Sequence, residues 1–145
     1  MRPARPDDAD ALLSWRNDPT TRTNSFDERP IDRDRHLAWL RGRLADPRTR
    51  IYVGLADGIE CGTVRFEPRN EGLAEVSITL DPRFRGKGLA AELLRVGLQN
   101  YRDECGPSRV IARVKAGNIA SLRAFERAGY RRVRSAADLV ELAID

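Results

Sequence analysis

The feature that most constrains the fold of this chain is a ten-residue segment that joins a strand pattern to a helix pattern. Residues 81–90 read Asp-Pro-Arg-Phe-Arg-Gly-Lys-Gly-Leu-Ala. Before them, apolar and polar residues alternate over 73–80, which predicts a strand, and the pattern over 88–101 predicts a helix. A glycine-bearing turn at the positive end of a helix directs several backbone N–H groups to one point, which favours phosphate. We therefore predict that residues 85–90 hold a phosphorylated small molecule.

Two other phosphate-binding loops fit this segment less well. The P-loop requires Ser or Thr after its Gly-Lys pair, whereas Gly88 follows Lys87 here. The dinucleotide fingerprint would be met by Gly86, Gly88 and Ala91, but that fingerprint follows a buried parallel strand. The strand over 73–80 instead places apolar residues on one face and polar residues on the other, which is typical of an antiparallel strand.

Composition excludes several other classes of protein. A length of 145 residues with 41% hydrophobic residues predicts one globular domain over 1–145. No apolar stretch approaches the roughly 20 residues of a membrane span, and the first residues lack the apolar segment of a signal peptide, so we expect a cytoplasmic protein without a membrane partner. Cys61 and Cys105 fit no metal or redox spacing, and His36 is the one histidine, so we expect no metal.

The charge pattern predicts a mixed surface rather than a nucleic-acid-binding one. The net charge is +4, but 22 acidic residues are interspersed with 26 basic ones. There is no long basic run and no aromatic RNA-binding signature, so we expect no nucleic-acid partner.

Turn and capping signals place the remaining elements. Asp57-Gly58 indicates a hairpin, and a meander of three antiparallel strands results. Residues 19–30 are polar, contain two prolines and are predicted to be a loop. The predicted strands span 1–4, 51–56, 59–66, 73–80, 109–114, 130–133 and 138–144, and the predicted helices begin near Asp7 or Asp8, Asp32, Gly88 and Asn118.

This order of elements resembles that of the GNAT family of acetyl-CoA-dependent N-acetyltransferases over nearly the whole chain. Arg83-x-x-Gly86-x-Gly88 is similar to the family's pyrophosphate motif, and Asn118-x-x-Ser121 followed by Phe125 looks like its second motif. The resemblance implies an α/β (α+β) fold with a mixed, largely antiparallel sheet of about six to seven strands flanked by four helices. It also implies acetyl-CoA as cosubstrate and no metal.

The resemblance further implies which residues contact acetyl-CoA. Backbone amides of the glycine turn would cradle the pyrophosphate, while the pantetheine arm lies between strands 73–80 and 109–114 like an added strand. Arg123 or Arg127 would lie near the adenosine phosphates. The implied contacts are Ile78, Leu80, Arg83, Arg85, Gly86, Lys87, Gly88, Leu89, Ala90, Asn118 and Ser121.

The implied reaction is direct attack of a neutral amine on the thioester, and it needs a base. An α-amino group has a pKa of about 7.7–8, whereas a lysine amine, at about 10.4, is mostly charged at pH 7. Glu75 is the candidate base, because it lies on the polar face of the strand that leads to the thioester. The structural alternative is an exposed glutamate in a cross-strand pair with Arg65. A backbone N–H near Ile78 would polarise the thioester carbonyl.

The general acid departs from the family pattern. Many members carry Tyr seven residues after the motif's Asn, but this chain has Phe125, which donates no proton. Ser121 is the candidate acid, because it occupies a position with that role in ribosomal-protein acetyltransferases of the family. The alternatives for Ser121 are a surface hydroxyl or a cofactor hydrogen bond. Tyr130 is a second option, with core packing as its alternative, and the thiolate can also leave without enzymatic protonation.

The acceptor amine is expected to bind the first two helices and their loops, because the rest is committed to the cofactor. Their pattern resembles the amino-sugar-nucleotide and ribosomal-protein branches of the family. We expect a small-molecule amine, such as a nucleotide-linked amino sugar, with arginines on the diphosphate and tryptophans stacked on the base or sugar. The tryptophans have core packing as their alternative. The candidate residues are Trp15, Arg16, Asn17, Arg22, His36 and Trp39.

Two other functions remain open from the sequence. N-terminal acetylation of a ribosomal protein is the alternative reaction, with acidic residues such as Asp18, Asp27 and Glu28 receiving the ammonium group. A non-catalytic acetyl-CoA-binding module is the alternative of another class, and Phe125 favours it. A monomer and a homodimer are both compatible with the sequence.

Overall fold

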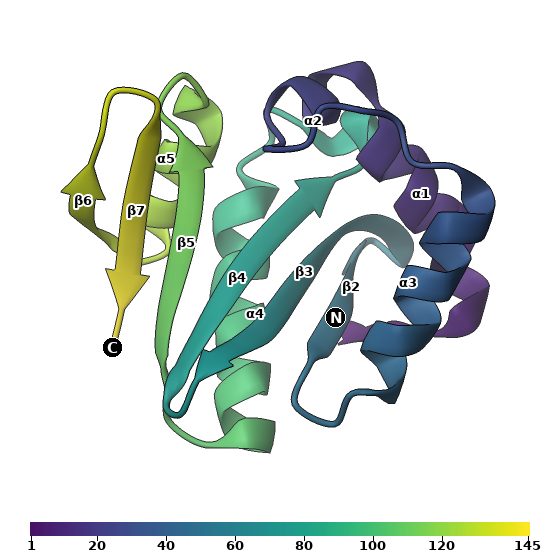
Figure 1. Cartoon of the computed structure of the whole chain (residues 1–145), viewed down its shortest axis with the longest axis horizontal. Coiled ribbons are helices and arrows are strands. Elements are labelled where there is room, and N and C mark those ends of the chain that lie inside the picture. The colour runs from purple at the N-terminus through teal and green to yellow at the C-terminus, as the bar shows by residue number, and fades with distance from the viewer.

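Seven strands form one sheet in the computed structural model, which describes residues 1–145. They are β1 Arg2–Pro3, β2 Arg50–Ala56, β3 Ile59–Asn70, β4 Leu73–Leu80, β5 Arg109–Lys115, β6 Arg131–Ser135 and β7 Leu139–Ile144. Their spatial order is β1-β2-β3-β4-β5-β7-β6 (Figure 1). Only the contact between β4 and β5 is parallel, so the predicted mixed and largely antiparallel sheet is confirmed.

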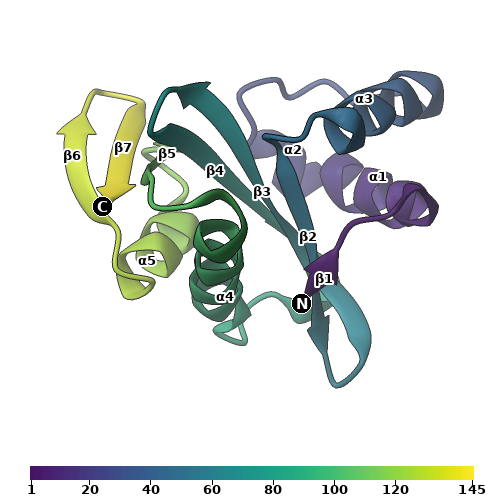
Figure 2. The same cartoon turned by 90° about the horizontal axis from the view of Figure 1, so that it is seen from below.

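Five α-helices cover the two faces of the sheet. They are α1 Ala9–Asn17, α2 Pro19–Thr23, α3 Arg33–Ala45, α4 Leu89–Cys105 and α5 Ile119–Arg127. Figure 2 shows α4 and α5 on one face, and α1 and α3 on the other. None of these helices is both long and apolar enough to cross a bilayer.

The prediction that residues 19–30 form a loop is wrong in its first part, because α2 lies there. Asp18 follows the last residue of α1, and its carboxylate begins α2. It accepts hydrogen bonds from the N–H groups of Thr20 and Thr21, at 3.1 and 3.2 Å. Pro19 occupies the first helical position, where a missing N–H costs nothing. An Asp-Pro pair can therefore start a helix as well as stop one.

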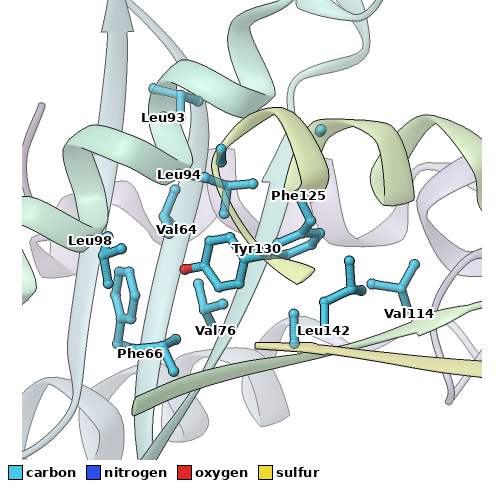
Figure 3. Close-up of a cluster of buried hydrophobic side chains, with 14 of the residues drawn as sticks. Val64, Phe66, Val76, Leu93, Leu94, Leu98, Val114, Phe125, Tyr130 and Leu142 are labelled. Atoms are coloured by element: carbon cyan, nitrogen blue, oxygen red, sulfur yellow. The ribbon is translucent and has the colours of Figure 1, made fainter. Parts of the chain in front are cut away.

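The larger of two hydrophobic cores lies between the sheet and helices α4 and α5 (Figure 3). Helix α4 is amphipathic, and Leu94 on its inner face is fully buried against the sheet. The smaller core joins α1 and α3 to β2, and includes Leu12, Trp15, Leu40, Ile51 and Val53. The sheet is therefore packed on both faces.

Candidate active site

The central feature of the site is a gap in the sheet between β4 and β5. The two strands pair only over their first residues, from Leu73 opposite Arg109 to Glu75 opposite Ile111. Beyond Glu75, β4 keeps its partner β3 as far as Leu80, whereas β5 pairs with β7. The second half of β4 therefore has one bonded edge and one open edge, and the strands diverge there (Figure 1).

The open edge of β4 carries backbone groups of alternate residues. The N–H of Asp81 donates to a carbonyl of β3 at 2.9 Å, so odd-numbered residues of β4 direct their backbone groups to β3. The carbonyl of Gly72 accepts from the N–H of Arg109 at 3.0 Å, so even-numbered residues face the β5 side. By this alternation, Ile78 and Leu80 direct their backbone groups into the gap, where an extended ligand can pair with them.

A cavity of about 710 Å³ lies along this gap. Residues 76–80 of β4 form one wall, and the glycine turn and the start of α4 line the cavity as well. The segment after α1 contributes Thr20, Thr21, Asn24, Ser25, Phe26 and Asp27. The volume lies within the range of about 300–1,000 Å³ that is usual for small-molecule sites. Other residues on its wall are Arg16, Arg65, Glu67, Arg69, Glu75, Arg113, Asn118, Ser121, Arg123, Phe125 and Arg127.

The glycine turn has the backbone conformation that an anion cradle requires. Gly86 and Gly88 both have a φ of +74°, in the left-handed region that favours glycine. A Cβ atom at either position would meet no atom within 4 Å, so the space beside the turn is open. Gly88 is the N-cap of the 17-residue helix α4, and Leu89 and Ala90 in its first turn also line the cavity. Amides at such a helix start lack helical acceptors and attract anions.

The three basic side chains of the turn have different roles. Arg83 forms an ion pair of 2.8 Å with the buried Asp81, and hydrogen bonding to Arg83 holds the pKa of the Asp81 carboxyl below its usual range. The Lys87 ammonium lies 5.3 Å from the centre of a phenylalanine ring. Neither Arg83 nor Lys87 lies on the cavity wall. Arg85 does, and it bonds to Asp18 at 2.7 Å and to Thr21 at 2.9 Å, which ties the turn to α2.

The predicted second motif lies at the start of α5. The Asn118 side chain caps this helix by accepting a hydrogen bond from the N–H of Ser121 at 3.3 Å. Both residues lie on the cavity wall, together with Arg123 and Arg127. The predicted cap is therefore present, and its side chain and the Ser121 hydroxyl can both reach a ligand in the gap.

Tyr130 does not reach the cavity, which removes it as an acid. Its ring packs edge to face on Phe125, with 5.1 Å between the ring centres. Its hydroxyl is buried without a hydrogen-bond partner, pointing into the apolar cluster toward Leu98 and Phe66 (Figure 3). Burial raises the pKa of this hydroxyl. The structure therefore favours the core-packing alternative for Tyr130.

Glu75 lies on the cavity wall beside the point where β4 and β5 separate. The predicted cross-strand pair between Glu75 and Arg65 is wrong. The residue directly opposite Glu75 in β3 is Glu67, which itself pairs with Arg65. Glu75 instead forms ion pairs with Arg113, at 3.0 Å, and with Arg69. Its side chain is 16% exposed, so the carboxylate is held in place yet open to the cavity.

Of the six acceptor-binding candidates, only Arg16 lies on the cavity wall. Trp15 is 5% exposed because its ring belongs to the smaller core, so it cannot stack on a ligand. Asn17 joins two backbone segments, with hydrogen bonds of 2.8 and 2.9 Å to the carbonyl and N–H of Ile31. Arg22 is half-buried but does not line the cavity.

The other two candidates, His36 and Trp39, stack on each other. His36 is buried, and its ring lies 5.7 Å from that of Trp39. Burial lowers the pKa of His36, which favours a neutral ring. The Arg65 guanidinium lies 4.9 Å from the centre of the Trp39 ring. Trp39 therefore contacts the cavity wall at Arg65, and His36 lies behind Trp39.

Sequence reasoning missed the charged residues of the sheet itself. Arg65, Glu67 and Arg69 occupy every second position of β3, and Arg113 lies on β5. All four side chains line the cavity. A signal was present, because charges at every second position of a central strand mark a polar face that the fold must solvate or use. No group of His, Cys, Asp or Glu side chains forms a candidate metal site.

Comparison with known proteins identifies similar chains with acetyltransferase activity. A family model described as the acetyltransferase (GNAT) domain matches residues 1–131. The L-2,4-diaminobutyric acid acetyltransferase of Streptomyces avermitilis is 29% identical over 128 residues, which are 86% of this chain and 68% of that protein.

Solved structures share the fold. AAC(6')-Ib, an aminoglycoside acetyltransferase, in complex with paromomycin and acetyl-CoA, has a TM-score of 0.83 and 17% identity, covering 98% of this chain and 90% of that chain. A ribosomal-protein-alanine N-acetyltransferase from Brucella melitensis has a TM-score of 0.83 and 22% identity, covering 99% of this chain and 97% of that chain. At these identities the likeness establishes the architecture, and the acceptors of these relatives differ widely.

Proposed function

The chain belongs to the GNAT acetyltransferase family, and we propose that it transfers the acetyl group of acetyl-CoA to a primary amine of a small molecule. The match over residues 1–131 confirms the family predicted from the two motifs. The observation that carries the proposal is the open edge of β4 beside a positive-φ glycine turn at a helix start. Together they provide one groove for an extended thiol-bearing arm and one cradle for its phosphates.

The groove fits coenzyme A in both charge and shape. We assign the pyrophosphate to the backbone of residues 85–90, where the positive φ angles and open space allow close approach. The pantetheine arm would pair with the backbone of Ile78 and Leu80 and with the Asn118 side chain. Arg123 and Arg127 form no ion pair within the protein, so their charges are free for the adenosine phosphates.

The residues around the cavity support direct transfer. Acetyl-CoA supplies a thioester that a neutral amine can attack. The cavity wall contains no cysteine and no histidine, so it offers neither a thiol nucleophile nor an imidazole that would activate its serines to form a covalent acetyl-enzyme. Glu75 would accept the proton of the amine, directly or through water, and the Ile78 N–H would stabilise charge on the thioester oxygen. Ser121 would donate a proton to the departing sulfur.

The acceptor is proposed to be a small-molecule amine. The nucleotide-linked amino sugar loses much of its support, because Trp15 is buried and Arg22 does not line the cavity. On the proposed acceptor side, the segment after α1 lines the cavity with short polar side chains and Phe26. A cavity of about 710 Å³ has room for a compact amine.

Thiol release tests the proposed function. We expect the purified protein to release coenzyme A from acetyl-CoA in the presence of small primary amines, as measured with a chromogenic thiol reagent. The amine panel includes a UDP-linked amino sugar, diamino acids, aminoglycosides and peptides with free N-termini. Binding of acetyl-CoA without turnover of any amine would favour the non-catalytic module.

A pair of variants tests the general acid. Replacing Ser121 with alanine is expected to lower kcat about tenfold or more, because proton donation to a leaving group contributes to the rate. Adding Phe125→Tyr to that variant should restore part of the loss, because Phe125 lines the same cavity. Steady-state thiol release measures both. Unchanged kcat in Ser121→Ala would show that the thiolate leaves without a proton, which the acidity of thiols permits (a cysteine thiol has a pKa of about 8.5).

A further inference from the structure

The acceptor end of the cavity carries more positive charge than its carboxylates balance. We define this end as the charged side chains on its wall that lie away from the glycine turn and α5: Arg16, Asp27, Arg65, Glu67, Arg69, Glu75 and Arg113. Each carboxylate already has an arginine partner. Glu67 pairs with Arg65 at 2.5 Å, Glu75 pairs with Arg69 and Arg113, and Asp27 pairs with Arg29 at 2.9 Å.

Arg16 is the cation at this end without a carboxylate partner. Its Nη2 donates to the backbone carbonyl of Asp27 at 2.7 Å, and its Nη1 is buried with no hydrogen-bond partner. Burial lowers the pKa of this guanidinium, the nearby charges of Arg22 and Arg65 act in the same direction, and the Asp27 carboxylate opposes them without forming an ion pair with Arg16. A guanidinium nevertheless stays protonated in proteins. A half-buried charge without a paired carboxylate is unfavourable, so an anion that enters the cavity would be attracted to it.

We propose that the amine acceptor carries an anionic group, a carboxylate or a phosphate, that pairs with Arg16. The inference rests on the proposed acetyltransferase function and names its substrate class. A planar guanidinium matches both anions and can bind either one through two parallel hydrogen bonds. Polycationic amines such as aminoglycosides fit poorly, because no carboxylate at this end is free to receive a second ammonium group.

Matched amines test the proposal on the intact protein. One pair is L-2,4-diaminobutyrate and its carboxamide, and the other is O-phosphoethanolamine and ethanolamine. We expect the anionic member of at least one pair to have a kcat/KM at least about 30-fold higher than its neutral counterpart, the factor for losing a buried charge pair. The preferred pair identifies the anion as carboxylate or phosphate. Kanamycin, a polycation, should be a poor acceptor.

Variants of Arg16 assign the effect to this residue. Arg16→Met should raise the KM for the anionic amine about 30-fold or more. The KM values for the neutral amine and for acetyl-CoA should stay within a few-fold of those of the native protein. Arg16→Lys should recover part of the loss, because it keeps the charge but not the planar fork. Arg33→Met is the matched control, because it removes the same charge from an exposed position on α3, where Arg33 pairs with Asp10.

The outcomes distinguish the anionic acceptor from the acetyltransferase function on which it rests. Turnover of neutral or polycationic amines at equal or higher kcat/KM than the anionic ones would overturn the anionic acceptor and keep the acetyltransferase. An equal effect of Arg16→Met on charged and neutral members of a pair would also overturn it, because the residue would then act only on structure. Acetyl-CoA binding without turnover of any amine would overturn both.

Discussion

Replacing Gly88 with valine is expected to abolish measurable binding of acetyl-CoA. Gly88 has a φ of +74°, which a β-branched residue adopts only under strain. The space beside it is open, with no atom within 4 Å of the position that a Cβ would take, so the new side chain would occupy the cradle rather than collide with protein. Affinity should fall about 100-fold or more, since the phosphates lose both the backbone approach and the helix start. Isothermal titration calorimetry with acetyl-CoA and with coenzyme A measures this.

Gly72→Val is the matched control for backbone strain. Gly72 has a φ of +71°, and a Cβ there also meets nothing within 4 Å. It lies in the turn before β4, at the opposite end of that strand from the glycine turn (Figure 1). Both variants should lose roughly 1–3 kcal/mol of unfolding free energy, the usual cost of a non-glycine residue in this region. Only Gly88→Val should lose the cofactor, and normal binding by Gly88→Val would contradict the assignment of the phosphate site.

The elements that carry the proposed donor half could be predicted because their signals are local. The strand over 73–80, the glycine turn and the helix that begins at Gly88 follow one another in the chain, and each has a pattern of its own. Asn118 could be predicted as a cap for the same reason. Backbone groups of alternate residues in a strand face opposite edges. Once β3 is known to be the partner of β4, this alternation directs the backbone groups of Ile78 and Leu80 into the gap.

The acceptor half could not be predicted because its residues meet only through tertiary packing. Trp15 and Arg16 are neighbours in α1, yet one is buried in the smaller core and the other lies on the cavity wall. Which face of a short helix turns inward depends on the helix that packs against it, here α3. The partner of Glu75 likewise depends on strand register, because a shift of two residues would place Arg65 opposite Glu75 instead of Glu67.

Arg85 links the two halves, because it lines the cavity beside the cradle and bonds to Asp18 and Thr21 at the start of α2. Interaction with Arg85 lowers the pKa of the Asp18 carboxyl, so the contact persists to low pH. A ligand that displaces Arg85 toward its phosphates would therefore also release a restraint on the segment that encloses the acceptor.

Replacing Glu75 with glutamine is expected to lower kcat about 100-fold or more while leaving acetyl-CoA affinity within a few-fold. The amide keeps the size of the side chain but cannot accept a proton, and general bases contribute roughly 10²–10⁴ to the rate. Steady-state thiol release measures kcat, and isothermal titration calorimetry measures the affinity for acetyl-CoA.

Glu67→Gln is the comparison that distinguishes catalysis from charge balance. Glu67 lies directly opposite Glu75 in β3, lines the same cavity and is also held by two arginines, Arg65 and Arg43. If Glu75 only neutralises Arg69 and Arg113, both substitutions should change KM and thermal stability to a similar extent and leave kcat within a few-fold. If Glu75 is the base, only its substitution lowers kcat about 100-fold or more. A large loss of kcat in Glu67→Gln alone would instead transfer the role of base to Glu67, one strand further from the gap in the sheet.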